Sequence, residues 1–372
     1  MCTIGIVAEY NPFHNGHKYQ IDLIKNMYDN PTIIAVVASS FCERGNLSVL
    51  NKWDKTSIAL ENGVDLVIEL PFVFASQSAD IFAKGALKIL NELKVQKIVF
   101  GSESNDLEAI KSIANLQINN KNFDKELKEE IDKGINYPTA LSNIIKKYTN
   151  KKIDSPNDLL GISYIKEIIK NNYNIEPIAI KRTNKYHEKN AKEKISSATS
   201  IRNLIYNNKR INKYVPFNPK KYNIYKPDIF KLLKYKILSE KDLSIYNTVD
   251  EGLEKRIIKY INEANNLEEL TNLIKTKRYT YNRINRMFIH ILTSFTKEEA
   301  KEIDINYIRV LGFNNKGKAY LNNVNCNIIT RYKDNNYKEL LIEKRVNEIY
   351  SLIVDDKSLI KKEIDKPIIK VC

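Results

Sequence analysis

The stretch TIGIVAEYNPFHNGHKYQIDLIKNM, residues 3–27, indicates a buried strand that runs into an amphipathic helix. Residues 3–8 are almost continuously apolar, which is typical of a parallel strand covered on both faces of its sheet. Pro12 ends the strand because it has no N–H to give to the ladder. Apolar residues then recur with helical spacing from Ile21 to Met27. The sequence therefore predicts a helix that begins near His14–His17.

The same alternation of strand and helix continues through the first half of the chain. One intervening stretch, SADIFAKGALKILNELK (78–94), has a helical pattern. Alternation of this kind predicts an α/β fold with a doubly wound, Rossmann-like parallel sheet, whose ligands lie at the carboxyl ends of the strands. The other strand-like runs are TIIAVVA (32–38), DLVIEL (65–70), KIVFGS (97–102) and IEPIAI (175–180).

A proline-containing stretch divides the chain. Three prolines within YVPFNPKKYNIYKP discourage a continuous helix, so residues 211–227 are predicted to be a linker. Residues 1–210 would then form one domain, built on the predicted sheet. Residues 228–372 would form a second domain that is basic and mainly helical.

The distribution of charge predicts a polyanionic partner. The net charge is +15. Residues 1–200 carry 26 Lys and Arg against 24 Asp and Glu, whereas residues 201–372 carry 34 against 21. A basic excess confined to one domain is typical of nucleic-acid contact. The alternative is a lysine-rich composition bias, which the balanced first half disfavours.

Neither a membrane span nor a secretory leader is predicted. The longest apolar runs, such as IIAVVA (33–38), have only the length of a strand. Glu9 and Asn11 interrupt the apolar N-terminus early. The four cysteines form no C-x-x-C pair, so neither a structural zinc site nor a disulfide is expected. The absence of such pairs is typical of a reducing compartment, and we expect a cytoplasmic location.

His14 and His17 lie three residues apart on either side of Gly16, in a chain with only four histidines. Their predicted place at a helix N-terminus offers free backbone N–H groups and the positive end of the helix dipole. Both side chains could donate to one phosphate, and the glycine leaves room for that phosphate to approach the backbone. We therefore predict a phosphate site. The alternatives are local packing of the two rings, or a zinc site, for which no third ligand lies nearby.

A second element, ISSATSIR at 195–202, has the residue types that a nucleotide site needs. Ser197 and Thr199 can cap a helix and donate O–H groups to phosphate. Arg202 would lie in the first turns of that helix, beside a leaving pyrophosphate. The alternative is an ordinary Ser/Thr N-cap.

HNGH after the first strand resembles the H-x-G-H signature of the nucleotidyltransferase superfamily, and ISSATSIR resembles its I-S-S-T-x-I-R element with one extra residue. Longer stretches resemble the bacterial tRNA(Met) cytidine acetate ligase family. FCER at 41–44 departs from the more usual F-x-Q-R, so Glu43 has no role carried over, while Arg44 is retained. The stretches are VAEYNPFHNGH (7–17), SSFCERGNLSVLNKW (39–53), NGVDLVIELPFVFASQSAD (62–80), FGSESND (100–106), SPNDLLGISYIK (155–166), IKRTNKYHE (180–188), KRYTYNRINRMFIHIL (277–292) and YIRVLGFNNKGK (307–318).

This resemblance implies a ligase in which ATP, accompanied by Mg²⁺, activates acetate as acetyl-adenylate with release of pyrophosphate. The acetyl group would then pass to the wobble cytidine of elongator tRNA(Met), giving N4-acetylcytidine. His14, His17 and Arg202 would be catalytic through charge stabilisation, and no resident metal site is expected. The ATP-binding residues expected from the resemblance and from the element at 195–202 are Val7, Ala8, Glu9, Tyr10, Asn11, Pro12, Phe13, His14, Asn15, Gly16, His17, Lys18, Tyr19, Gln20, Gly101, Asn157, Arg182, Ser197 and Thr199.

Three of these residues also have simpler interpretations. Gly101 could be a plain turn, Asn157 a helix cap and Arg182 a surface charge. Without the resemblance, each simpler interpretation would be at least as good as nucleotide binding.

The tRNA contacts are predicted on two segments. The stretch 39–52 has no clear period, and loops of that length are often lids or binding loops, so Arg44 is predicted to meet the tRNA or to close over the adenylate. Arg278, Arg283 and Arg286 are interleaved with tyrosines, a combination of phosphate donors and rings that can stack on bases. A solvated helix face is the alternative for these three.

Some features fit no catalytic role. GFNNKGKA (312–319) has Ala319 where a P-loop needs Ser or Thr, so a basic loop against RNA or a simple turn is expected there. His290 is expected to be structural, and His187 to lie near the site or on the surface.

Two other functions stay open: a small-molecule nucleotidyltransferase, and a non-catalytic RNA-binding protein with a relic nucleotide fold. The sequence predicts no oligomeric state.

Overall fold

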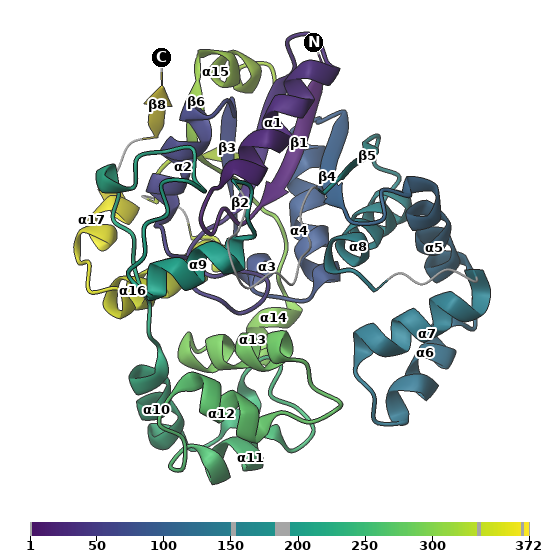
Figure 1. The fold of residues 1–372 in the computed structure, drawn as a ribbon, viewed down its shortest axis with the longest axis vertical. Coiled ribbons are helices and arrows are strands. Elements are labelled where there is room, and N and C mark those ends of the chain that lie inside the picture. The colour runs from purple at the N-terminus through teal and green to yellow at the C-terminus, as the bar shows by residue number, and fades with distance from the viewer. Residues whose placement is uncertain (1, 150–153, 183–193, 333–335, 366–367, 372) are drawn as a thin grey trace.

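Five parallel strands at the centre of the structure confirm the doubly wound sheet expected from the sequence. The computed structural model describes residues 2–149, 154–182, 194–332, 336–365 and 368–371 (Figure 1). The strand order is β5-β4-β1-β2-β3-β6-β7, with β8 paired to β6. The strands are β1 (Thr3–Ala8), β2 (Thr32–Ala38), β3 (Leu66–Leu70), β4 (Lys97–Ser102), β5 (Glu176–Lys181), β6 (Ile308–Asn314), β7 (Ile328–Ile329) and β8 (Ile369–Val371).

Helices cover both faces of this sheet. Successive residues of β2 belong alternately to two buried clusters: Ile33 packs with residues of α1, α2 and α9, and Ile34 with residues of α3, α4, α8 and α16. The helices are α1 (Asn15–Met27), α2 (Lys52–Glu61), α3 (Phe72–Ala75), α4 (Ala79–Glu92), α5 (Leu107–Asn119), α6 (Phe123–Asp132), α7 (Tyr137–Thr149), α8 (Pro156–Lys170), α9 (Ala198–Tyr206), α10 (Phe230–Ser239), α11 (Leu253–Tyr260), α12 (Leu267–Ile274), α13 (Tyr281–Leu292), α14 (Lys297–Lys301), α15 (Asn315–Leu321), α16 (Lys338–Ile353) and α17 (Ser358–Asp365).

The sheet opens between β1 and β4 at the carboxyl ends of these strands. The pairing of β1 with β4 ends at Gly5, although β1 stays paired with β2 as far as Ala8 and β4 with β5 as far as Ser102. The Gln20 side chain of α1 donates to Val99 O of β4 at 3.1 Å, which ties the helix after β1 to the strand across the opening. The strand order reverses here, so this opening is the topological switch point at which open α/β sheets bind ligands.

The chain between α9 and α10 lies against the α2 side of the molecule. It is non-helical apart from one 3₁₀ turn at Pro219–Lys221. The Tyr225 N–H donates to Val49 O at 2.8 Å. The Tyr222 hydroxyl lies 3.2 Å from both carboxylate oxygens of Glu61 at the end of α2. These contacts fix the course of the segment over the surface.

The C-terminal residues return to the sheet after a group of helices, α10–α14 (green in Figure 1). β6 pairs antiparallel with β3, and β8 pairs parallel with β6. β6, β7 and β8 therefore extend the sheet formed by the first half of the chain, whereas residues 228–372 were expected to form a second, mainly helical domain. The difference arises because strand pairing between β3 and β6 is a contact between distant parts of the chain, which local periodicity does not report.

A buried ionic network holds this return in place. Arg309 of β6 pairs with Glu69 of β3, with 3.2 Å between Nη1 and Oε2, and also with Glu363 of α17. Lys52 of α2 lies 2.6 Å from Glu69 and 2.7 Å from Glu363. All four side chains are buried. Two cations therefore face two carboxylates where β3, β6, α2 and α17 meet.

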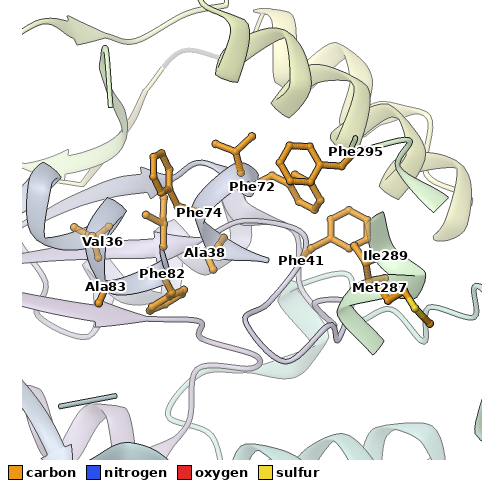
Figure 2. Close-up of a cluster of buried hydrophobic side chains, with 14 of the residues drawn as sticks. Val36, Ala38, Phe41, Phe72, Phe74, Phe82, Ala83, Met287, Ile289 and Phe295 are labelled. Carbon is orange, nitrogen blue, oxygen red and sulfur yellow. The ribbon is translucent and has the colours of Figure 1, made fainter. Parts of the chain in front are cut away.

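The helical group shares a core with the sheet (Figure 2). The Phe72 ring of α3 lies 5.6 Å from the Phe295 ring and 5.6 Å from the Phe41 ring, centroid to centroid. His290 of α13 is fully buried, and its Nε2 lies 2.8 Å from Ser76 O. This histidine ties α13 to the end of α3.

Candidate functional site

His14 and His17 cap the N-terminus of α1. His14 is the N-cap residue, and its Nδ1 accepts the Gly16 N–H at 3.0 Å. His17 Nδ1 accepts the His14 N–H at 3.2 Å. The two rings stack with their centroids 3.8 Å apart and 24° between their planes. Because each Nδ1 accepts a hydrogen bond, each neutral ring carries its proton on Nε2, which leaves two N–H donors free of the backbone.

Both imidazoles are neutral near pH 7. Burial, and then the charges of Arg182 and Arg202, lower the pKa of His14 to about 3. Burial, followed by the effects of His14 and Arg182, lowers the pKa of His17 well below its usual value. A protonated ring would lose the Nδ1 acceptor that closes the cap. The cap and the pair of Nε2–H donors therefore require the same protonation state.

Ser197 and Arg202 place the second element beside the histidines. Ser197 Oγ accepts the Ser200 N–H at 3.1 Å at the start of α9, the N-cap that the sequence predicts. Arg202 Nη1 donates to Asn11 O at 2.8 Å, and Nη2 donates to Thr199 Oγ1 at 3.1 Å. The guanidinium group thus ties α9 to the turn before the histidines and holds a positive charge there.

Glu103, Asn157 and Arg182 meet where β4, β5 and α8 come together. Asn157 Nδ2 donates to Glu103 Oε1, and Arg182 Nε lies 3.7 Å from the same oxygen. A Cβ at Gly101 would lie 3.1 Å from Arg182 Cγ, so the glycine allows this arginine to pack closely. Since the carboxylate takes the amide N–H of Asn157, the amide Oδ1 is left to accept from a ligand. Glu103 lies in the stretch FGSESND, but no role for it was predicted from the sequence.

The loop after β2 connects the site to the helical group. Arg286 Nη1 lies 3.2 Å from Glu43 Oε1 and 3.0 Å from Glu43 O. The Glu43 N–H donates to Glu9 Oε1 at 2.8 Å, and Glu43 Oε2 lies 3.7 Å from Arg44 Nε. Gly45 has a φ of +71° and lies so close to α13 that a Cβ would be 2.4 Å from Arg286 N. Glu43, at which FCER departs from the more usual F-x-Q-R, therefore links α13 to the site.

Most of these groups line one cavity of about 190 Å³ at the opening between β1 and β4, whereas Glu103, Gly45 and Arg286 lie behind the lining residues that they contact. The structure brings most of the sequence-predicted site residues together there. Those that line the cavity are Val7, Ala8, Glu9, Tyr10, Asn11, His14, His17, Gln20, Arg44, Gly101, Asn157, Arg182, Ser197, Thr199 and Arg202.

Several residues of the 7–20 stretch do not line the cavity. Phe13 is buried against Tyr10 and His17, with ring centroids 4.7 and 5.4 Å away. The Asn15 N–H donates to Tyr214 O at 3.0 Å, so this residue faces the segment that follows α9. The others outside the lining are Pro12, Gly16, Lys18 and Tyr19.

The cavity also has lining residues that the sequence analysis did not assign to it. Most are apolar side chains from α4, β4 and α8, and their periodicity indicated only a buried helix or strand face. Glu43 was noted without a role. The full set is Glu43, Asn46, Phe82, Phe100, Leu160, Tyr164 and Ala198.

The three arginines predicted on 277–292 are each paired with a carboxylate. Arg278 Nη2 lies 2.7 Å from Glu251 Oε1, and Arg283 Nη2 lies 3.8 Å from Asp250 Oδ2. Arg286 makes the contact with the loop after β2 described above. Contact between these arginines and RNA stays a prediction, and RNA would have to compete with the carboxylates.

The stretch 312–319 spans the end of β6 and the start of α15 rather than a flexible loop. A Cβ at Gly317 would lie 2.0 Å from Asp65 O, so this glycine serves close packing. In the described part of the chain, no group of three or more His, Cys, Asp or Glu side chains could hold a metal ion. No helix described there has the length and apolar character to cross a membrane. His187 lies outside the described residues.

Comparison with known proteins agrees with this geometry. A sequence model of the HIGH nucleotidyl transferase family matches residues 1–365. The chain is 38% identical to the tRNA(Met) cytidine acetate ligase of Caldicellulosiruptor saccharolyticus, with 95% of this chain and 94% of the relative covered. It is 35% identical to the enzyme of that name from Bacillus subtilis, with 96% and 93% covered. The chain belongs to the tRNA(Met) cytidine acetate ligase family.

Solved structures of that family share the whole fold. The apo crystal structure of Thermotoga maritima TmcAL matches with a TM-score of 0.91 at 28% identity, over 100% of both chains. The same protein bound with alpha-thio ATP matches with a TM-score of 0.87 at 29% identity, again over 100% of both chains. The family resemblance and the fold class inferred from the sequence are confirmed.

Proposed function

We propose that the protein is an ATP-dependent ligase of the cytoplasm that acetylates the wobble cytidine of elongator tRNA(Met), using acetate. The names of the relatives support this reaction and its tRNA, and the alpha-thio ATP complex of TmcAL supports ATP as the nucleotide. The observation that carries the proposal is the α1 cap, which presents the two neutral Nε2–H donors of His14 and His17 in the cavity that Arg182 and Arg202 also line.

In the first step an acetate oxygen attacks the α-phosphorus of ATP, and the bond from that phosphorus to the pyrophosphate breaks. Negative charge grows on the phosphate oxygens, which hydrogen-bond donors and cations stabilise. His14 and His17 supply neutral N–H donors, and Arg202 supplies a fixed charge for the leaving pyrophosphate. Ser197 and Thr199 add hydroxyl groups from the start of α9.

The nucleoside half of ATP is proposed to lie toward β4, β5 and α8. Gly101 leaves the end of β4 open, and Arg182 reaches the cavity from the end of β5. Asn157 would accept a hydrogen bond from the nucleoside through Oδ1, since Glu103 occupies its Nδ2.

Mg²⁺ fits this scheme as a companion of the triphosphate. The carboxylates that line the cavity are Glu9 and Glu43, and Glu43 is engaged by Arg286 and Arg44. One or two carboxylates together with substrate phosphates are the usual ligands of Mg²⁺. Glu9 is the residue that would hold the ion, whose charge would offset that of the phosphates.

In the second step the N4 amine of cytidine attacks the acetyl carbonyl carbon, AMP leaves, and the amine loses a proton. An acyl-enzyme is not needed, because the adenylate is already a good leaving group. Cys42 is a poor candidate for such an intermediate: burial, and then Glu9, raise the pKa of its thiol to about 12, so it stays protonated. Arg44, at the cavity, and Arg278, Arg283 and Arg286 on the helical group are the proposed tRNA contacts.

Two measurements test the proposal. Acetate should stimulate exchange of labelled pyrophosphate into ATP, and incubation with ATP, labelled acetate and tRNA(Met) should give N4-acetylcytidine in the digested nucleosides. Exchange that needs a phosphorylated metabolite in place of acetate would favour a small-molecule nucleotidyltransferase. Binding of tRNA without any exchange would favour a relic nucleotide fold.

A further inference from the structure

Residues 207–227, which lie between the end of α9 and the Asp228 that precedes α10, carry only positive charge. It has six basic side chains and no acidic one, and all six are exposed. Among the residues that the structure describes, none of the six forms an ion pair with a carboxylate. The six are Lys209, Arg210, Lys213, Lys220, Lys221 and Lys226.

Hydrogen bonds hold this segment against the N-terminus of α1 and join its two ends just after α9. The Asn15 N–H donates to Tyr214 O at 3.0 Å, and Asn15 Nδ2 donates to Lys213 O at 3.0 Å, so the chain runs along the N-terminus of α1. At the other end, Lys226 Nζ bonds to Asn208 Oδ1. The segment therefore leaves α9 and returns to it.

Four of the six basic residues gather at this point. Lys209, Arg210 and Lys213 follow α9, and the bond to Asn208 brings Lys226 back to them. We call these four the α9 basic patch. Because a helix rises about 1.5 Å per residue, Lys209 lies only about two turns beyond the cavity-lining Arg202.

An aromatic ring lies within the patch. Tyr206, in the last turn of α9, is 45% exposed. Its hydroxyl donates to Pro227 O at 3.3 Å, which holds the ring in place between the two ends of the segment. An exposed ring among basic side chains is the combination that single-stranded RNA loops bind, through stacking and phosphate contacts.

Within the described residues the four patch side chains form no ion pair with a carboxylate, which distinguishes them from the arginines of 277–292. Arg278, Arg283 and Arg286 are neutralised by acidic side chains in the free protein. Unpaired cations gain more from a polyanion, because they release condensed counterions without first losing an ion pair.

We propose that the α9 basic patch binds the phosphate backbone of the tRNA anticodon arm next to the nucleotide cavity. The proposal rests on the proposed function, since the cytidine amine must enter the cavity to reach the adenylate. The phosphates on either side of that nucleotide must then pass close to the cavity. The start of α9 lines the cavity, and the patch follows the end of the same helix.

The test is a triple variant, K209A/R210A/K213A, compared with K121A/K125A/K128A. The control removes three exposed lysines, one just before α6 and two within it, and so changes the net charge equally. Binding of tRNA(Met) is measured over a range of KCl concentrations. The patch variant should bind at least about tenfold more weakly, and the slope of log K against log salt should fall by about two to three, since each lost contact removes about 0.7–0.9. K209R/K213R, which keeps the charge, should bind like the parent.

Exchange of pyrophosphate into ATP, with acetate and without tRNA, separates this proposal from the proposed function. The patch variant should retain the parent exchange rate. An unchanged salt slope, or an equal loss in the α6 control, would overturn the assignment of the patch. Loss of exchange in the patch variant would also overturn it, because the patch would then serve ATP. If the parent itself shows no acetate-dependent exchange, the proposed function fails, and the tRNA measurement still decides whether the patch binds RNA.

Discussion

The rings of His14 and His17 stack with their centroids 3.8 Å apart, and the Nδ1 of each ring accepts a hydrogen bond from a backbone N–H of the same helix cap. A single local arrangement thus closes the first turn of α1 and fixes which nitrogen carries the proton. The phosphate-facing donors are set by the fold before any ligand arrives. Catalysis and helix capping can therefore be separated by a side chain that keeps the capping acceptor but has no N–H at the position of His14 Nε2.

Asparagine at position 14 is such a side chain. Asn is a strong N-cap residue, so His14→Asn should unfold at nearly the same temperature as the parent, whereas His14→Ala should lose about 1 kcal/mol of stability. Both variants lack the Nε2–H donor and should lose about 10²–10³-fold in acetate-dependent exchange. Thermal unfolding and exchange are measured on the same preparations. If His14→Asn exchanged pyrophosphate at the rate of the parent, His14 would have no part in the proposed chemistry.

The buried histidines also predict how stability depends on pH. Burial is the largest cause that lowers the pKa of His14 to about 3 and that of His290 to about 4, from about 6.5 in the unfolded chain. Between these values the unfolded state binds more protons, so stability rises with pH and is lost as pH falls below about 6.5. Each of the two should destabilise the fold by about 2 kcal/mol at pH 5 relative to pH 7.5.

Calorimetric unfolding from pH 7.5 to 5 tests this expectation. Carboxylates also titrate toward the acid end of this range, so the parent is compared with His14→Asn, which lacks one of the buried histidines. The variant should lose less stability than the parent between pH 6.5 and 5. Identical pH profiles for the two proteins would show that His14 titrates normally in the folded state.

Alanine substitutions at two glycines with a left-handed backbone distinguish the effect of backbone strain from that of close packing. Gly45 and Gly252 have φ values of +71° and +81°. An alanine Cβ at Gly252 would have no atom within 4 Å, but at Gly45 it would lie 2.4 Å from the backbone of Arg286. Gly252→Ala should cost about 1–2 kcal/mol of stability and leave exchange unchanged. Gly45→Ala should cost more and also slow exchange, because α13 and the loop that carries Glu43 must move apart.

Denaturant unfolding and exchange of the two variants give the comparison. Equal stability losses and equal activities would mean that the approach of α13 to the loop after β2 is not needed for the site.

The sequence predicted those parts of the site whose geometry is local. The H-x-G-H turn, the cap at Ser197 and the position of Arg202 depend on residues within a few positions of one another, and the five N-terminal strands have near-continuous apolar runs. Glu103 and Glu43 were not assigned because their partners, Asn157 and Arg286, lie 54 and 243 residues away in the chain. Contacts of that range follow from strand order and helix packing, which the pattern of one segment does not contain.

The C-terminal strands show the same limit in the fold. The stretch IRVLGFN at 308–314 is apolar enough for a strand, but only its antiparallel pairing with β3 reveals that it belongs to the first sheet. The charges of Arg309 and Glu69 did not predict this pairing either, because a charged side chain in a strand usually faces water. Here the two charges face each other in the interior, and neither could be buried alone.

This burial yields a final prediction. Arg309→Met keeps most of the side-chain volume but removes the cation that Glu69 and Glu363 share with Lys52. An unpaired buried carboxylate is strongly unfavourable, so the variant should lose about 3–5 kcal/mol of stability.

Arg278→Ala is the control: it breaks an exposed ion pair with Glu251 and should cost less than about 1 kcal/mol. Denaturant unfolding of both variants measures the difference. Because an apolar replacement can be neutral when a whole buried network is removed, the quadruple variant Arg309→Met, Lys52→Met, Glu69→Leu, Glu363→Leu, which removes both cations together with both carboxylates, should recover part of the loss. A single variant as stable as the parent would mean that the cation is not needed to hold β6 and α17 against β3.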